Sequence, residues 1–203
     1  MQRSYSRLLG VIGKPNTGKS TFFSAATLVA AEIANYPFTT IKPNRGVGYV
    51  RTKCVHEDFK VKDNPRNSLC LDGTRLVPVE LIDVAGLVPG AWEGRGLGNQ
   101  FLDEIRRADA LIHVVDASGG TDCEGKTCKI GEHDPIEDVQ FLEREITMWI
   151  LTILKKDWSK IARTSEADKK GVAAPLEERL TGLGIKRNSI VEAIRKANLN
   201  PDK

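Results

Sequence analysis

An eight-residue motif near the N-terminus narrows the possible folds of this chain to a small set. Residues 13–20 read GKPNTGKS and match the pattern G-x-x-x-x-G-K-[ST] at every fixed position. An apolar run, Leu8 to Ile12, precedes the motif, and a stretch of helical character, residues 19–31, follows it. Because this motif requires a strand before it and a helix after it, we predict a phosphate-binding loop within an α/β fold.

The spacing of the motif follows from the chemistry of a bound triphosphate. Glycines let the backbone wrap closely around phosphates with its N–H groups pointing inward, and the loop delivers the phosphates to the positive end of a helix. Lys19 would add a positive charge at the β- and γ-phosphates, and the Ser20 hydroxyl would ligate Mg²⁺. The residues expected to hold the nucleotide here are Gly13, Lys14, Pro15, Asn16, Thr17, Gly18, Lys19, Ser20 and Thr21.

A second motif lies at the end of another apolar run. Leu81 and Ile82 lead into Asp83, and Gly86 follows three residues later, which gives the D-x-x-G arrangement of P-loop GTPases. In that arrangement the carboxylate holds Mg²⁺, usually through water, and the glycine amide contacts the γ-phosphate. The same four positions also occur in ordinary turns, but a preceding strand favours the nucleotide site.

A third candidate element is the pair of threonines in the loop at residues 33–44. This loop contains Pro37 and Pro43, which favour irregular structure around Thr39 and Thr40. A GTPase needs a threonine in this place to complete Mg²⁺ coordination while the γ-phosphate is present. The alternative is a pair of solvated loop hydroxyls.

The distribution of apolar residues predicts how the chain is organised. Strands are expected at residues 8–12, 46–51, 76–82 and 110–115, and their alternation with helix or loop indicates a parallel sheet. The polar residues 52–75 predict an exposed hairpin between two of these strands. Helices are expected at 138–158, 175–182 and 187–197, where apolar residues recur at helical spacing. We therefore divide the chain into an α/β part, residues 1–136, and an α-helical part, residues 137–203.

Composition excludes several classes of protein. The chain has 203 residues, of which 40% are hydrophobic and 28% charged, with a net charge of +3. No apolar stretch is long enough to span a bilayer, and no secretory signal is evident at the N-terminus. We expect a cytoplasmic protein with reduced thiols, with no membrane partner and no DNA partner.

Three weaker signals each have two readings. Cys123 and Cys128, with His113 and His133, suggest zinc, but their spacing fits no common zinc pattern and unpaired thiols explain them as well. The apolar stripe at 141–154 could contact a partner or pack within a helical hairpin. The remaining signal is a set of basic residues that a solvated helix face would explain, and for which the family resemblance described below equally suggests contact with ribosomal RNA: Lys155, Lys156, Lys160, Arg163, Lys169 and Lys170.

With these motifs in place, the chain resembles the Obg-related GTPases, and among them the archaeal form of the YchF-type branch. Obg-type proteins share a loop like residues 35–44, NYPFTTIKPN, and a stretch like residues 83–91, DVAGLVPGA. Residues 94–102, GRGLGNQFL, look YchF-like in particular. The resemblance covers residues 8 to about 160 and implies a Ras-like P-loop GTPase fold followed by a coiled-coil-like helical insert.

The resemblance also implies roles for individual residues. Thr40 matches the family's Mg²⁺-binding threonine, and Leu87 stands where Ras-like GTPases carry the glutamine that orients water. Asn16 matches an asparagine that seats K⁺ near the phosphates in K⁺-dependent relatives, although a simple turn residue is the alternative. No N-K-x-D guanine-reading motif follows Ser118. We therefore expect an N-terminal fragment, with a sheet that is incomplete at its C-terminal side.

Taken together, the sequence predicts a slow Mg²⁺-dependent nucleoside triphosphatase, with GTP favoured over ATP, that acts as a ribosome-associated switch. Lys19, Thr40 and Gly86 are the expected catalytic residues, and Ser20, Thr40 and Asp83 the expected metal ligands. Two alternatives stay open. The first is an ATP-hydrolysing YchF-type protein, and the second is a non-catalytic binding module that docks through its helical insert.

Overall fold

The structure is a computed structural model that describes residues 7–32, 45–94, 104–156, 158–168 and 171–199. Its strands are β1 (Leu8–Ile12), β2 (Arg45–Lys53), β3 (Leu69–Leu71), β4 (Thr74–Asp83) and β5 (Ala110–His113). Its helices are α1 (Lys19–Glu32), α2 (His56–Phe59), α4 (Pro135–Lys155), α5 (Trp158–Asp168), α6 (Ala173–Leu180) and α7 (Arg187–Lys196), with short 3₁₀ turns η1 (Ala91–Glu93) and η2 (Thr181–Leu183). The predicted α/β fold followed by helices is confirmed.

The sheet has the order β2-β4-β1-β5, with β3 beside the start of β4. β1 lies parallel to both β4 and β5, as predicted. The expectation of an all-parallel sheet is wrong for β2, which pairs antiparallel with β4 from Arg45↔Ile82 to Lys53↔Thr74. A parallel pair needs a crossover, usually a helix of several turns, whereas the β2–β4 connection (residues 54–73) contains only the four-residue α2 and the short strand β3.

Helix α1 covers one face of this sheet at close range. A Cβ atom at Gly46 in β2 would lie 2.5 Å from the Thr27 side chain in α1. Glycine at this position therefore allows α1 and β2 to approach each other closely. This contact fixes α1, and with it the loop from which α1 begins.

The main hydrophobic cluster joins the sheet to α4. Its buried members are Ile12, Ile82, Val84, Leu87, Ala91, Ile105 and Leu142. Leu142 comes from α4, which begins where the Asp134 carboxylate accepts a hydrogen bond of 2.9 Å from the Ile136 N–H. The predicted division between residues 136 and 137 lies within the first turn of α4, and the first half of that helix packs on the α/β core. The division itself stays a prediction.

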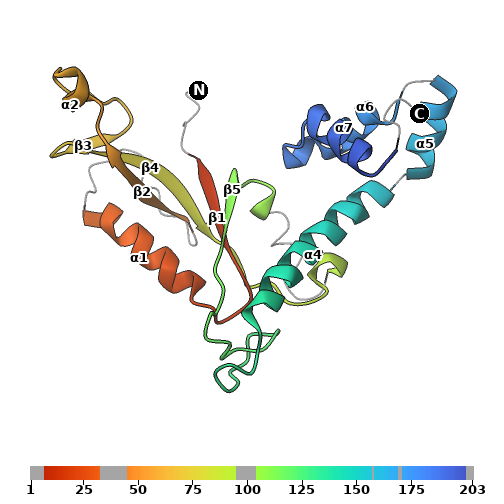
Figure 1. Cartoon of the computed structure of the whole chain (residues 1–203), viewed down its shortest axis with the longest axis horizontal. Helices are drawn as coiled ribbons and strands as arrows, with labels where there is room; N and C mark the ends of the chain where they lie inside the picture. Colours follow the sequence, from red (N-terminus) through yellow and green to blue (C-terminus); the bar gives the residue numbers. More distant parts are fainter. Residues whose placement is uncertain (1–6, 33–44, 95–103, 157, 169–170, 200–203) are drawn as a thin grey trace.

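The C-terminal helices form a second cluster at the far end of α4. Ala173, Leu176, Leu180 and Ile190 are buried there, and Ile150 and Leu154 of α4 pack against them. Figure 1 shows α4 running from the phosphate-loop end of the sheet outward to α5, α6 and α7. Within the described part of the chain, none of the helices combines the length and apolar character needed to cross a membrane.

Candidate functional site

The predicted phosphate loop connects β1 to α1, as the motif requires. Gly13 has φ +148°, and a Cβ atom there would lie 2.4 Å from the Val114 carbonyl oxygen. Only glycine fits this position, because both the φ angle and the contact exclude a side chain. Gly18 has φ +90°, and α1 follows it, with the Phe22 N–H donating to the Gly18 carbonyl at 2.9 Å. The first N–H groups of α1 therefore face the mouth of the loop.

The Lys19 side chain extends back over the loop to residue 14. Its Nζ donates a hydrogen bond of 2.8 Å to the Lys14 carbonyl oxygen, and its side chain is largely buried. Burial lowers the pKa of the Lys19 ammonium, and the nearby Asp83 carboxylate partly opposes that shift. An anion in the loop would meet this ammonium in a partly desolvated place, where its attraction is strongest.

The two predicted metal ligands that the structure describes lie side by side. The Ser20 hydroxyl donates a hydrogen bond of 2.6 Å to Oδ2 of Asp83, at the end of β4. The other carboxylate oxygen, Oδ1, is buried and has no hydrogen-bond partner among the described residues. A buried carboxylate oxygen without a partner is unfavourable, and a divalent cation or its water would satisfy it. The donor set, a hydroxyl and a carboxylate, is the one that Mg²⁺ prefers.

Gly86 packs directly on the phosphate loop. A Cβ atom at Gly86 would lie 2.8 Å from the backbone nitrogen of Pro15, so a side chain would push the two segments apart. The next residue, Leu87, donates its N–H to the Gly13 carbonyl at 3.1 Å. The Leu87 side chain is 1% exposed and belongs to the main hydrophobic cluster. The Leu87 side chain therefore points into the hydrophobic core.

The remaining predicted residues divide into three groups. Thr17 donates from its hydroxyl to the Lys14 carbonyl at 3.2 Å, which closes a turn of the loop. Thr21 lies exposed in the first turn of α1. Thr39 and Thr40 fall outside the described residues, so the structure does not place them relative to the loop.

Lys14 shows a feature that the motif does not predict. Its side chain is completely buried beneath the loop, where Nζ donates to the Thr121 carbonyl at 2.8 Å. Nζ also lies 2.8 Å from Oδ2 of Asp138 in α4, an ion pair without the angle of an aligned hydrogen bond. His133 holds the other oxygen of Asp138, with 2.8 Å between Nε2 and Oδ1. Lys14 can therefore offer a phosphate only its backbone N–H.

The segment after β5 covers the side of the loop. The Asn16 side-chain amide donates to the Gly125 carbonyl at 2.8 Å, and a Cβ atom on Gly125 would lie 2.4 Å from the Pro15 carbonyl oxygen. Asp116 organises this segment by accepting hydrogen bonds from the hydroxyls of Ser118 and Thr121, which lower the pKa of Asp116 to about 2. The sequence predicted only a loop here. Its one signal was a set of glycines at residues 119, 120, 125 and 131.

Helix α4 also holds the segment that follows Gly86. The buried Glu145 carboxylate accepts hydrogen bonds from the Gly90 N–H at 2.8 Å and from the Trp92 N–H at 3.0 Å. Together with Asp138, this places two acidic residues of one helix on two segments of the site. Neither residue was predicted, because nothing local marks a carboxylate that will meet a backbone more than 50 residues away.

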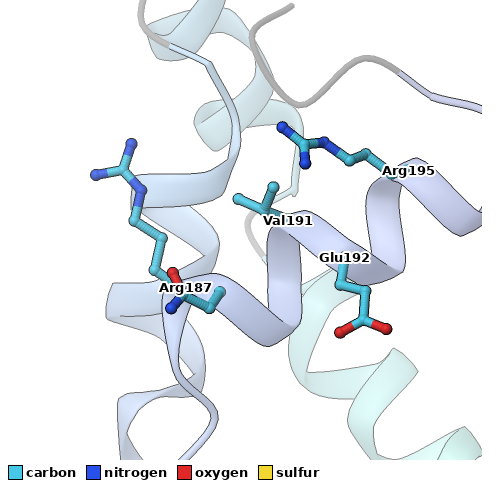
Figure 2. Close-up of a pocket in the computed structure, with 5 residues that line it drawn as sticks. Arg187, Val191, Glu192 and Arg195 are labelled. Atoms are coloured by element: carbon cyan, nitrogen blue, oxygen red, sulfur yellow. The ribbon is translucent and has the colours of Figure 1, made fainter.

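The candidate zinc ligands of the sequence do not come together in the structure. Cys123 is exposed, His113 ends β5 and His133 is bound to Asp138, and the described part of the chain does not gather them into a metal-ligand group. An open hollow of about 490 Å³ lies on α7. Figure 2 shows Arg187 and Arg195 at its two ends, with Val191 and Glu192 between them.

A family model described as a 50S ribosome-binding GTPase matches residues 8–156. Over 196 residues the chain is 55% identical to a GTP-binding protein of Methanocaldococcus jannaschii, covering 97% of this chain and 49% of that protein. It is 35% identical over 170 residues to the ribosome-binding ATPase YchF of Bacillus subtilis, covering 83% and 43%.

A solved structure agrees with these matches. The crystal structure of a GTP-binding protein from Pyrococcus horikoshii superposes with a TM-score of 0.74 at 42% identity, and the match covers 96% of this chain and 47% of that one. The chain thus spans about half the length of the curated relatives that it matches.

Proposed function

Because this chain belongs to the family of 50S ribosome-binding GTPases, we propose that it binds GTP with Mg²⁺ at residues 13–20 and hydrolyses it slowly. The observation that carries this proposal is the pairing of Ser20 with Asp83. The two residues are 63 positions apart in the sequence, yet their side chains lie 2.6 Å apart at the start of α1. The unsatisfied Oδ1 of Asp83 supports a cation at this position.

Each part of the site has a role in this proposal. The N–H groups of residues 14–19 surround the phosphates, and the Lys19 ammonium leaves the Lys14 carbonyl to face the β- and γ-phosphate oxygens. Ser20 and Asp83 hold Mg²⁺, with Thr40 as a further ligand and Thr39 beside it. Bound Mg²⁺ would neutralise charge on the phosphate oxygens. The Gly86 N–H contacts the γ-phosphate, since Gly86 packs against the loop at Pro15.

The proposal of slow hydrolysis rests on residue 87, which is a leucine and not a polar residue that could orient water. The Leu87 side chain is apolar and buried, so it cannot orient the attacking water. We propose that backbone groups and a K⁺ ion near Asn16 take this role, since Gly125 engages the Asn16 amide nitrogen and leaves its oxygen for a cation. Turnover should be faster in K⁺ than in Na⁺ buffer. Equal rates would remove the role assigned to Asn16.

The choice between GTP and ATP rests on the relatives. Some are named as GTP-binding proteins, and the YchF proteins of bacteria are named as ATPases. We propose GTP because the relative at 55% identity is named as a GTP-binding protein. Titration with fluorescent analogues of both nucleotides tests this choice, and tighter binding of the ATP analogue would reverse it.

A second candidate function is docking through the C-terminal helices. The relatives named as ribosome-binding suggest a ribosomal partner, and the exposed Lys155, Lys156 and Arg163 are suited to phosphates of RNA. Glu192 pairs with Lys196 at 2.8 Å beside the α7 hollow and reduces the positive charge there. Binding to ribosomes without measurable nucleotide binding would favour this module over the GTPase.

A cytoplasmic location stays a prediction.

The proposed nucleotide site is tested by the Mg²⁺ dependence of binding. A fluorescent GTP analogue is titrated against the chain with Mg²⁺ and with a chelator. We expect Mg²⁺ to tighten binding, and Asp83→Asn to abolish most of that effect. Asp72→Asn is a matched control, because Asp72 lies in an exposed turn with φ +46°, a conformation that asparagine tolerates. Equal Mg²⁺ dependence in Asp83→Asn would contradict the proposal.

A further inference from the structure

Four side chains with metal-binding atoms converge in the connection between β2 and β4. They are Cys54, His56, Asp63 and Cys70, and each offers one ligand atom that lies within 4.8 Å of all the others. No single local motif gathers them. Cys54 follows β2, His56 begins α2, Asp63 lies in the following loop and Cys70 lies in β3.

One edge of this cluster has the length expected in a tetrahedral metal site. Sγ of Cys70 lies 3.7 Å from Nδ1 of His56. With zinc–sulfur and zinc–nitrogen distances near 2.3 and 2.05 Å, tetrahedral ligands of these two kinds are about 3.6 Å apart. The observed spacing therefore needs little adjustment at this edge. Sulfur, imidazole and carboxylate donors together favour Zn²⁺ over Mg²⁺ or Ca²⁺, which prefer oxygen alone.

Asp63 supplies an independent observation. Its Oδ1 accepts a hydrogen bond of 2.6 Å from the Arg75 guanidinium, which also donates to the Ser68 hydroxyl at 3.0 Å. Its Oδ2 is buried without a hydrogen-bond partner among the described residues. One oxygen fixed by an outer partner and the other left open is the arrangement of a carboxylate that ligates a metal through one oxygen. Arg75 would also balance the negative charge of the ligands.

The two thiols differ in their surroundings, since Cys54 is buried and Cys70 is partly exposed. Zinc binds cysteine as the thiolate, so Zn²⁺ binding would release the protons of the Cys54 and Cys70 thiols to solvent, with no change of oxidation state.

Among the described residues, none in the connection belongs to either of the two hydrophobic clusters. Its large apolar side chains are turned to solvent, with Phe59 75% and Val61 58% exposed. Cys54 itself is buried, and its N–H donates to the Gly73 carbonyl at 2.7 Å. Segments that cannot bury a core commonly depend on a metal or a disulfide for their order. A metal ion would tie β2, α2, β3 and the intervening loop at one point.

We propose that Cys54, His56, Asp63 and Cys70 bind one Zn²⁺ ion as a structural site. The site is separate from the nucleotide. Cys70 pairs with Arg75 near the start of β4, while Asp83 ends that strand, and ten strand residues extend about 30 Å. Figure 1 shows α2 and β3 at one end of the sheet and the beginning of α1 at the other.

The test uses the whole chain, freed of metal under reducing conditions and titrated with Zn²⁺ alone. We expect one tightly bound equivalent, and with Co²⁺ the absorption bands of a tetrahedral ion with thiolate ligands. Cys70→Ser should weaken Zn²⁺ binding at least 100-fold, and Asp63→Asn at least 10-fold. Cys123→Ser is the matched control, because Cys123 is exposed and outside the cluster. It should leave both the stoichiometry and the affinity unchanged.

Several outcomes would overturn the proposal. The first is the absence of stoichiometric Zn²⁺ binding, and the second is equal affinity for Zn²⁺ in Cys70→Ser and the parent chain. The third is a Cys54–Cys70 disulfide that forms in air in a chain that does not bind Zn²⁺. Cys70→Ser and Asp63→Asn both change partly exposed residues, so the second variant can still test the proposal if the first folds poorly. Affinity for the GTP analogue should be unaffected by Cys70→Ser, so failure here is distinguishable from failure of the nucleotide site.

Discussion

At the scale of single residues, Lys14, one of residues 13–20, forms a buried ion pair with Asp138. Both side chains are almost completely buried, so removing one charge leaves the other without compensation. Asp138→Ala should lower the free energy of unfolding by about 3–5 kcal/mol, measured by urea denaturation. Glu124→Ala breaks the exposed pair with Lys126 and should cost less than about 1 kcal/mol. Equal losses in the two variants would contradict this account.

Asp116 links the order of the covering segment to pH. Hydrogen bonds from Ser118 and Thr121 lower its pKa from 3.8 to about 2. Because the folded state holds this proton less tightly than the unfolded state, Asp116 stabilises the protein above pH 4, and its contribution disappears as the pH falls to about 2. The stability difference between the parent chain and Asp116→Asn should therefore shrink over this range. A constant difference between pH 5 and pH 2 would be inconsistent with the assignment.

Among the elements, α4 is the one that connects the site to the helices beyond it. Glu145 accepts hydrogen bonds from the Gly90 and Trp92 N–H groups, and bonds of this charged kind contribute about 1.5–3 kcal/mol each. Glu145→Ala removes both bonds and should destabilise the protein by about 3–6 kcal/mol and speed hydrogen exchange at these two amides. Glu143→Ala changes an exposed residue of the same helix and should do neither. Unchanged exchange in Glu145→Ala would show that α4 does not hold this segment.

The elements also show where sequence reasoning succeeds and where it stops. The strand at Leu8–Ile12 and the helix beginning at Lys19 were predicted because apolar runs and glycines act locally. The direction of β2 was not, since it depends on how the 54–73 connection folds back. Helix α4 was predicted as helical, but the sequence could not show which of its carboxylates meet the loop.

The same limit applies to the candidate site. Ser20, Asp83 and Gly86 could be predicted as site residues because their motifs have fixed spacing, and the structure brings Ser20 to Asp83 and Gly86 to Pro15. Asn16 and Gly125, in contrast, are 109 residues apart, and no spacing rule connects them. The predictions for Thr39 and Thr40 stay predictions. The sequence analysis considered Cys123 and Cys128 as zinc ligands, whereas the structure brings metal-binding atoms together at Cys54 and Cys70.

At the scale of the whole molecule, two hydrophobic clusters lie along α4. One includes Leu142 and the sheet, and the other includes Leu176 of α6 and its neighbours. Leu176→Ala should lower stability by about 2–5 kcal/mol while leaving affinity for the GTP analogue within about twofold. Leu199→Ala, at a residue that is 65% exposed, serves as the control and should change neither quantity. A large loss of nucleotide affinity in Leu176→Ala would mean that the second cluster supports the site directly.

The proposed nucleotide site lies where three parts of the fold meet. The loop comes from β1 and α1, Asp83 and Gly86 follow β4, and α4 supports the loop through Asp138. Glu145 connects the segment that follows Gly86 to α4 by accepting a hydrogen bond from the Gly90 N–H.

The most direct measurement is the affinity of Lys19→Ala for a fluorescent GTP analogue in the presence of Mg²⁺. The lost charged hydrogen bond corresponds to about 1.5–3 kcal/mol, so binding should weaken about 10- to 100-fold. Lys62→Ala removes an exposed lysine outside residues 13–20, and it should bind the GTP analogue with the same affinity as the parent chain. Unchanged triphosphate affinity in Lys19→Ala would show that residues 13–20 do not hold the phosphates.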